Sequence, residues 1–296
     1  MVGTLEAKAR LVLGGDVSLP EGFDDPLIDH RDGRPYSLVL SFDGCMVRKR
    51  ISPDGQFSLV EEGGILSLED SGKPFLEDVG IVRMFGHSPT TITVSIAKGG
   101  KVLSTEEALA IADGYSEMEP LKGVTIHGGS PCTIGHYAEV VRAYRERYPD
   151  LPIGVGSEDL GSAAIRILKD AGATNIKVTV KDRSNLVDLW DRFGDAVSVF
   201  GRGMVVCTMY IGQSATDASL LDDAERLCSI GVMPDLKVRK TAEGGRKDVP
   251  LDRYMAILER SKESMRRHGL DGSGFDTLCY GCRLCTIIPF KDFRGR

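Results

Sequence analysis

Strand-like and helix-like segments alternate along most of this chain, and this alternation restricts the fold more than any other feature of the sequence. Apolar, β-branched runs are each followed by a segment whose apolar residues recur at helical spacing. The expected strands are 91–96, 123–126, 153–156, 176–180, 204–210 and 236–238, and helices follow around 105–112, 134–144, 160–172, 186–190, 220–227 and 251–268. Because right-handed crossovers return the chain to the same strand direction, we predict a parallel sheet with helices outside it.

A parallel sheet of this kind is either an open doubly wound sheet or a barrel. No glycine-rich phosphate-binding fingerprint follows the first strand at 91–96, which disfavours the doubly wound form. We therefore expect an α/β fold with a partial or full (βα) TIM-type barrel, and chemistry at the carboxyl ends of its strands.

The sequence divides into three parts. Residues 1–90 contain short strand candidates at 36–42, 57–60 and 64–68, so we expect an N-terminal β-rich subdomain. Residues 91–270 form the predicted barrel, and residues 271–296 form a cysteine-rich tail.

Composition limits the possible partners. The formal net charge is -6 and no basic run is present, so nucleic-acid binding is not expected. The first residues lack the layout of a signal peptide, and no apolar run reaches membrane-spanning length. We expect a soluble, cytoplasmic protein without a membrane partner.

Three cysteines at two-residue intervals, Cys279, Cys282 and Cys285, dominate the tail. Thiolates at this spacing can converge on one metal centre, either a four-iron cluster with one iron left open or a zinc ion completed by a fourth ligand. That fourth ligand could be a histidine or one of the other cysteines, which are Cys45, Cys132, Cys207 and Cys228. Disulfides are disfavoured, because the number of cysteines, seven, is odd and a chain of this length needs no staples.

Polar residues follow several of the expected strands. They are His127-Gly128-Gly129-Ser130-Pro131, Ser157-Glu158-Asp159, Lys181-Asp182-Arg183 and Tyr210-Ile211-Gly212. Glu158, Lys181 and Arg183 could pair with an amino group and a carboxylate, although each alone could equally be a helix cap or a solvated residue at the rim. His127 could donate a proton at the barrel mouth or be structural, and Cys45 is a catalytic candidate, whereas Cys228 is expected in the core.

With these residues in view, the run from Thr91 to about Glu243 resembles the barrel of radical S-adenosylmethionine (SAM) enzymes, nearest to the biotin-synthase-like branch. Gly128-Gly129-Ser130-Pro131 is similar to the Gly-Gly-Glu-Pro segment that holds the SAM amino group, with Ser in place of Glu. The resemblance implies SAM contacts for Ser157 and Glu158, and places Tyr210, Gly212 and Val238 beside the adenine. The acidic residue of the family's fifth-strand motif is absent.

The chain departs from the family pattern at the cluster loop. That loop, with spacing Cys-x3-Cys-x2-Cys, should follow the first strand, but residues 97–101 contain no cysteine. Either the barrel has lost its cluster, or Cys279, Cys282 and Cys285 supply the ligands, as cysteines near the C-terminus do in the phosphomethylpyrimidine synthase family. An auxiliary cluster that works without SAM is a third possibility.

The resemblance implies an oxygen-sensitive enzyme with a [4Fe-4S] cluster that cleaves SAM to a 5'-deoxyadenosyl radical. A small-molecule substrate from cofactor biosynthesis and an electron donor such as ferredoxin or flavodoxin would then be its partners, in an anaerobic or sheltered setting. The alternative is a zinc- or cluster-stabilised barrel that acts as a non-SAM enzyme or as a binding or scaffold protein in cofactor assembly.

Overall fold

The computed structural model of the 296-residue chain contains two compact units. It describes residues 3–84, 88, 91–98, 100–116, 121–157, 161–180, 184–212, 216–238 and 249–292. The first unit consists of residues 1–84, 238–258 and 283–296, and the second of residues 85–237 and 259–282. The predicted three-part division at residues 90 and 270 stays a prediction.

A six-stranded parallel sheet forms the centre of the second unit. Its order is β16-β15-β14-β13-β12-β9, so each strand lies beside the strand that precedes it in the chain. The strands are β9 (Ile92–Ser95), β12 (Val124–His127), β13 (Ile153–Ser157), β14 (Asn175–Thr179), β15 (Val205–Ile211) and β16 (Val232–Val238). A doubly wound sheet would reverse its order at a switch point. The expected α/β fold with a parallel sheet is therefore confirmed, and among the described residues the sheet is open, with β9 and β16 at its edges.

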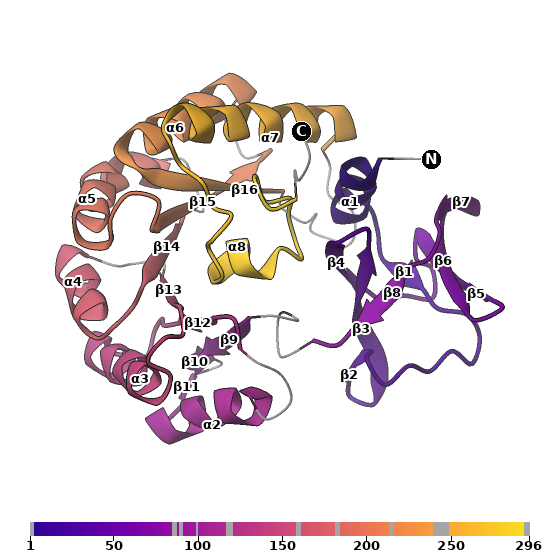
Figure 1. Cartoon of the computed structure of the whole chain (residues 1–296), viewed down its shortest axis with the longest axis horizontal. Helices are drawn as coiled ribbons and strands as arrows, with labels where there is room; N and C mark the ends of the chain where they lie inside the picture. The colour runs from indigo at the N-terminus through magenta and orange to yellow at the C-terminus, as the bar shows by residue number, and fades with distance from the viewer. Residues whose placement is uncertain are drawn as a thin grey trace. The chain divides into compact units, whose positions relative to one another are not determined.

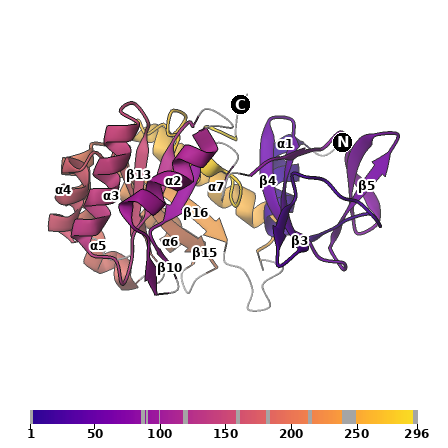
Figure 2. The ribbon, with the colours of Figure 1, turned by 90° about the horizontal axis from the view of Figure 1, so that it is seen from below.

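Helices cover the convex side of this sheet, and the sheet curves around the short helix α8 (Leu278–Cys282), as Figure 1 shows. The outer helices are α2 (Thr105–Ser116), α3 (Ile134–Arg147), α4 (Ser162–Asp170), α5 (Ser184–Phe200), α6 (Asp217–Ile230) and α7 (Leu251–Arg267). Figure 2 shows α3, α4 and α5 packed in succession along one side of the unit. The first strand is followed by a two-stranded hairpin of β10 (Ala97–Lys98) and β11 (Lys101–Val102).

The sequence explains why these helices begin and end where they do. Ser104 and Glu107 form a capping box at the start of α2, because the Ser104 hydroxyl accepts from the Glu107 amide and the Glu107 carboxylate accepts from the Ser104 amide. The predicted cap Thr133 accepts a hydrogen bond from the His136 amide at the start of α3. Gly231, with φ of 95°, ends α6 in the left-handed region that glycine adopts without strain.

The first unit is rich in β-strands, as expected, and most of them pair antiparallel. One sheet has the order β1-β5-β6-β7 and the other is built around β3, which pairs with β2, β4 and β8. The strands are β1 (Val17–Ser18), β2 (Asp29–Arg31), β3 (Arg34–Phe42), β4 (Cys45–Arg50), β5 (Phe57–Glu62), β6 (Ile65–Asp70), β7 (Lys73–Leu76) and β8 (Gly80–Val82). In the part of the chain that is described, no helix is both long and apolar enough to cross a membrane.

The N-terminal helix α1 (Thr4–Leu13) was not expected from the sequence. Its lysine Lys8 is fully buried, where its ammonium pairs with Asp292 at 2.8 Å and donates a hydrogen bond to the Arg283 carbonyl at 2.9 Å. Lys49 of β4 donates to the Leu11 carbonyl at the end of α1, at 2.8 Å. A charged residue on an otherwise apolar helix face obscured the helical pattern, and these partners compensate for its burial.

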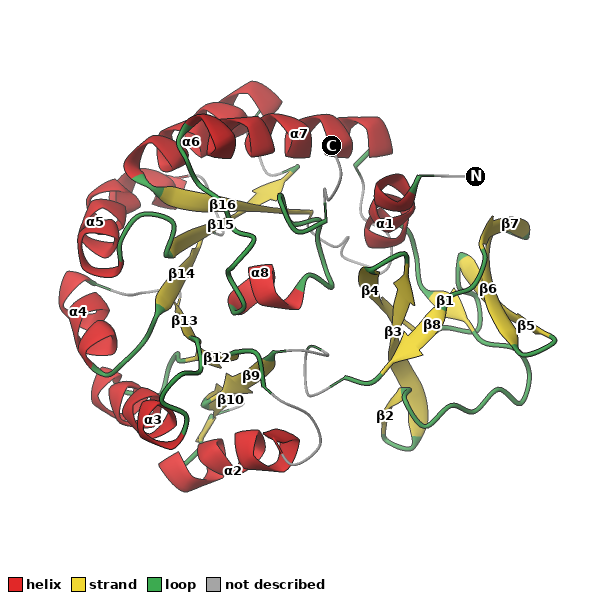
Figure 3. Ribbon diagram, in the orientation of Figure 1, coloured by secondary structure: helices red, strands yellow, loops and turns green. Residues whose placement is uncertain are grey.

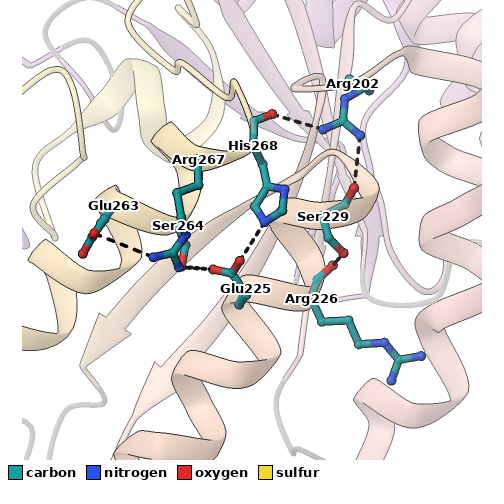
Figure 4. Close-up of polar contacts among 8 residues, drawn as sticks. All are labelled: Arg202, Glu225, Arg226, Ser229, Glu263, Ser264, Arg267 and His268. Atoms are coloured by element: carbon teal, nitrogen blue, oxygen red, sulfur yellow. Dashed lines mark hydrogen bonds and ion pairs between the residues drawn. The ribbon is translucent and has the colours of Figure 1, made fainter.

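A polar cluster joins the C-terminal ends of α6 and α7 in the second unit (Figure 4). The carboxylate of Glu225 accepts hydrogen bonds from Ser264, from Arg267 at 2.6 Å and from His268 at 2.7 Å. The Ser264 hydroxyl first, and then Arg267 and His268, lower the pKa of Glu225 to about 2. Arg202 adds two more bonds, to the carbonyls of Ser229 and His268.

Glu225 should make the stability of this unit pH-dependent. A carboxyl group whose pKa is lower in the folded than in the unfolded state stabilises the fold above its ordinary pKa and loses this contribution as pH falls. We therefore expect Glu225→Gln to cost about 0.5–1 kcal/mol at pH 7, a value reduced by solvent screening because the Glu225 side chain is 39% exposed. The difference from the unaltered chain should shrink between pH 5 and pH 2 in urea titrations.

Glu263→Gln is the matched control. Glu263 lies 3.7 Å from the same Arg267 but is 66% exposed, so its replacement should leave stability nearly unchanged. An equal loss in both variants, or a Glu225→Gln loss that is constant down to pH 2, would contradict the assignment.

Candidate functional site on the concave face of the parallel sheet

The concave face of the six-stranded sheet carries mostly polar side chains, with the buried Val206 beside Lys177 as an apolar exception, whereas its convex face is mostly apolar. Side chains alternate between the two faces along each strand, and residues paired across parallel strands share a face. The concave face carries Thr93, Ser95, Thr125, His127, Asn175, Lys177, Thr179 and Thr208, according to the strand register. The intervening residues, such as Ile126, Val155 and Ile176, are buried and apolar. Because bulky apolar side chains usually fill the inner side of a curved parallel sheet, a mostly polar concave face indicates a functional site.

Residues 276–282 dock onto this polar face, as the position of α8 inside the curved sheet shows in Figure 3. The Thr277 hydroxyl donates to Asn175 Oδ1 at 2.7 Å, and the Leu278 amide donates to the Thr125 hydroxyl at 2.7 Å. All four groups are buried, so each bond satisfies a polar atom that water cannot reach. The polar groups of residues 276–282 therefore pair with polar groups of the sheet face that these residues cover.

Two glycines permit this close approach. A Cβ at Gly154 would lie 2.7 Å from the Thr277 hydroxyl oxygen, and one at Gly123 would collide with the backbone oxygen of Asp276. Only a residue without a side chain fits at these two positions.

The docked segment places the sulfur of Cys279 between two lysines from different strands. Lys237 Nζ, from β16, lies 2.8 Å from Cys279 Sγ, and Lys177 Nζ, from β14, lies 3.5 Å from the same atom. All three side chains are partly buried. Two ammonium groups thus converge on one soft sulfur donor.

Asp235 holds the second lysine in place. Its carboxylate is 2% exposed, and Oδ2 accepts a hydrogen bond from the Thr208 hydroxyl at 2.8 Å and lies 3.4 Å from Lys237 Nζ. Its other oxygen, Oδ1, has no hydrogen-bond partner among the described residues. A buried acid beside a convergent lysine pair is the kind of arrangement found at functional sites.

His127, the predicted proton donor, ends β12 and lies in the same register layer as Gly156 and Lys177. A Cβ at Gly156 would lie 2.7 Å from His127 Nδ1, so the imidazole ring lies over the Gly156 backbone. The histidine is therefore on the concave face, at the level of Lys177.

The other predicted residues that can be placed lie at or just after the carboxyl ends of the strands. Gly128, Gly129, Ser130 and Pro131 follow β12, Ser157 ends β13, Tyr210 and Gly212 lie at the end of β15, and Val238 ends β16. Because the strands are parallel, their carboxyl ends all lie at the same end of the sheet. Glu158, Lys181 and Arg183 lie outside the described residues. The proposed SAM contacts remain proposals.

The predicted metal ligands are distributed over both units. Cys279 and Cys282 lie in α8 of the second unit, with Cys282 buried, and the exposed Cys285 belongs to the first unit. None of these three cysteines forms a disulfide. Among the described residues, no group of three or more His, Cys, Asp or Glu side chains is placed to hold a metal ion. The donor type fits a soft metal centre, whereas no such centre is assembled in the described geometry.

The remaining cysteines lie in different surroundings. Cys228 is buried, as expected, and burial raises its pKa to about 12. Burial also raises the pKa of Cys207 well above its usual value, and raises the pKa of Cys45 and Cys132. Cys45 belongs to β4 of the first unit and is 5% exposed, so it has the surroundings of an unreactive, buried thiol.

Sequence reasoning missed Lys177, Asp235 and Lys237. A signal was present, because each is a charged residue inside an otherwise apolar strand, in the runs Ile176-Lys177-Val178 and Pro234-Asp235-Leu236-Lys237-Val238. Charged residues inside a buried strand require a partner or a function.

Docking of residues 276–282 should depend on the Thr277 hydroxyl. Thr277→Val keeps the shape of the side chain but leaves the buried Asn175 Oδ1 without its donor, so we expect a loss of about 1–3 kcal/mol in urea unfolding. Cys279 should also react faster with iodoacetamide, because the segment is released more often. Ser95→Ala removes an exposed hydroxyl of the same sheet and should change neither quantity. Equal effects of the two substitutions would refute the docking role.

No protein-family model and no curated protein matches this chain. Among solved structures, it is similar to a radical SAM methyltransferase from Sphaerobacter thermophilus, with 16% identity, a TM-score of 0.44, and 74% of this chain and 76% of that chain covered. A dihydropteroate synthase from Coxiella burnetii matches with 14% identity, a TM-score of 0.37 and coverage of 70% and 65%. Muconate lactonizing enzyme from Pseudomonas putida matches with 16% identity, a TM-score of 0.37 and coverage of 60% and 44%. At these scores the similarities carry no argument for a function.

Proposed function

We propose that this chain is an enzyme of radical SAM type, with its active site on the concave face of the parallel sheet. Cys279, Cys282 and Cys285 would hold an iron-sulfur cluster, and the strand ends from His127 to Val238 would bind SAM and a small-molecule substrate. The observation that carries the proposal is the position of Cys279, whose sulfur lies on the polar concave face within reach of Lys177 and Lys237.

The chain's own residues suit this role in three ways. The concave face offers hydroxyl, imidazole and ammonium groups to a polar ligand, instead of the apolar filling of an inert barrel. After β12, Gly129 leaves room for a ligand to approach the backbone, since a Cβ there would meet nothing within 4 Å, whereas Gly128 packs against the Tyr137 ring. The three cysteines at two-residue intervals, none of them in a disulfide, are the donor type that iron-sulfur clusters take.

A bound and reduced cluster would supply the electron for reductive cleavage of SAM. Lys177 and Lys237 would place positive charge beside the anionic sulfur ligand Cys279, and hydrogen bonds to a ligand sulfur tune cluster potentials. Asp235 would orient Lys237, and the docked segment 276–282 would exclude water from the centre of the sheet.

Anaerobic reconstitution with iron and sulfide tests the cluster. We expect a brown protein with about four irons per chain and a broad absorbance at about 400 nm that dithionite bleaches. Cys279→Ala, Cys282→Ala and Cys285→Ala should each lose most of the iron, whereas Cys132→Ala, which changes a partly exposed cysteine of the second unit, should keep it.

SAM dependence is measured separately, as 5'-deoxyadenosine released after reduction of the reconstituted protein. Release that requires Cys279 and the other two ligands supports the radical SAM assignment. A brown protein that never cleaves SAM would reject it in favour of a non-SAM iron-sulfur enzyme, and a colourless protein with one tightly held zinc would reject the cluster itself.

A further inference from the structure

We propose that Lys177 and Lys237 form a binding site for the anionic group, a carboxylate or a phosphate, of a small-molecule ligand. The site lies on the concave face of the parallel sheet, beside the Cys279 sulfur. It follows from the placement of the two lysines and does not require the iron-sulfur cluster.

The ammonium groups of Lys177 and Lys237 converge on one point. The two lysines come from strands separated by β15, and both ammonium groups nevertheless lie within 3.5 Å of the same sulfur atom. Two like charges held so close together repel each other unless an anion lies between them.

The positive charge of Lys177 has no carboxylate beside it among the described residues. Lys237 lies 3.4 Å from the Asp235 carboxylate, but no described carboxylate lies within ion-pair distance of Lys177. Lys177 has three N–H donors, and the Cys279 sulfur is its one hydrogen-bond acceptor among the described side chains. Among the described side chains, no carboxylate therefore balances the positive charge of Lys177, which a single ligand carboxylate or phosphate would neutralise.

The surroundings of Lys177 are polar and lie inside the sheet. Lys177 projects from the middle of β14, in the same layer as His127 and Gly156, on a face lined by hydroxyl and amide groups. Lysine binds both carboxylates and phosphates as a point charge, so the geometry does not select between the two groups.

Protection of Cys279 from alkylation measures the site directly. The 296-residue chain, without added metal, is treated with iodoacetamide in the presence of malonate or glycerol 3-phosphate, with malonamide and glycerol as uncharged counterparts. Mass spectrometry reads each site, since trypsin cleaves at Arg283 and separates Cys285 from the peptide 268–283, in which fragment ions distinguish Cys279 from Cys282.

We expect at least one anion to slow alkylation of Cys279 at concentrations where its uncharged counterpart has no effect. Malonate alone would indicate a carboxylate ligand, and glycerol 3-phosphate alone a phosphate ligand. Lys177→Met and Lys237→Met should each raise the half-protecting concentration by about ten-fold or more, which is the effect of losing one charge-assisted hydrogen bond. Lys177→Arg, which keeps the charge, should retain part of the protection.

Lys122→Met is the control, because Lys122 is an exposed lysine of the same unit. Equal protection in the Lys122, Lys177 and Lys237 variants would overturn the proposal, as would malonamide and glycerol that protect as well as the anions do. Circular dichroism at the assay temperature shows whether each variant is folded. If Lys177→Met is unfolded, the comparison of Lys177→Arg with Lys177→Gln decides in its place. The iron content of the reconstituted chain is independent of this result, so a failure here leaves the cluster assignment intact, and the reverse also holds.

Discussion

The hydrogen bonds between residues 276–282 and the concave face of the parallel sheet determine most of what is distinctive about this molecule. Thr277 bonds to Asn175 and the Leu278 amide bonds to Thr125, both in the buried centre of the second unit. A sheet with a polar inner face needs partners there, because unpaired buried groups are costly. The C-terminal segment supplies them, and in doing so it brings Cys279 to Lys177 and Lys237, residues that are far away in the sequence.

The arrangement of the sheet and its outer helices followed from the apolar pattern. Residues such as Ile176 and Val178 face the helices and made β14 recognisable, and the hydroxyl of Thr133 marked the start of α3. The same alternation assigns Lys177 to the other face, but the sequence alone does not show what fills that face. Helix α8 has five residues, too few for any periodicity, and its position depends on contacts across more than a hundred residues of sequence.

The site could be anticipated only in part. The spacing of Cys279, Cys282 and Cys285 made them stand out, and buried Cys228 and Cys207 show how different an ordinary core cysteine is. The lysines beside Cys279 could not be linked to it from the sequence, because they lie inside strands and the docked segment brings Cys279 to them from far along the chain. Charged residues inside strands, rather than those after them, carry the strongest signal in this fold. The helix α1 was missed for a related reason, since its buried Lys8 is compensated by a partner at the other end of the chain.

Cross-linking of Cys279 to its neighbours tests the central claim most directly. A short reagent that joins a thiol to an amine, followed by tryptic digestion and mass spectrometry, identifies which lysines lie beside this sulfur. The structure predicts links from Cys279 to Lys177 and Lys237 and none to the exposed Lys122. Links to surface lysines in place of these two would show that residues 276–282 do not occupy the concave face, and would contradict both the site and the function proposed for it.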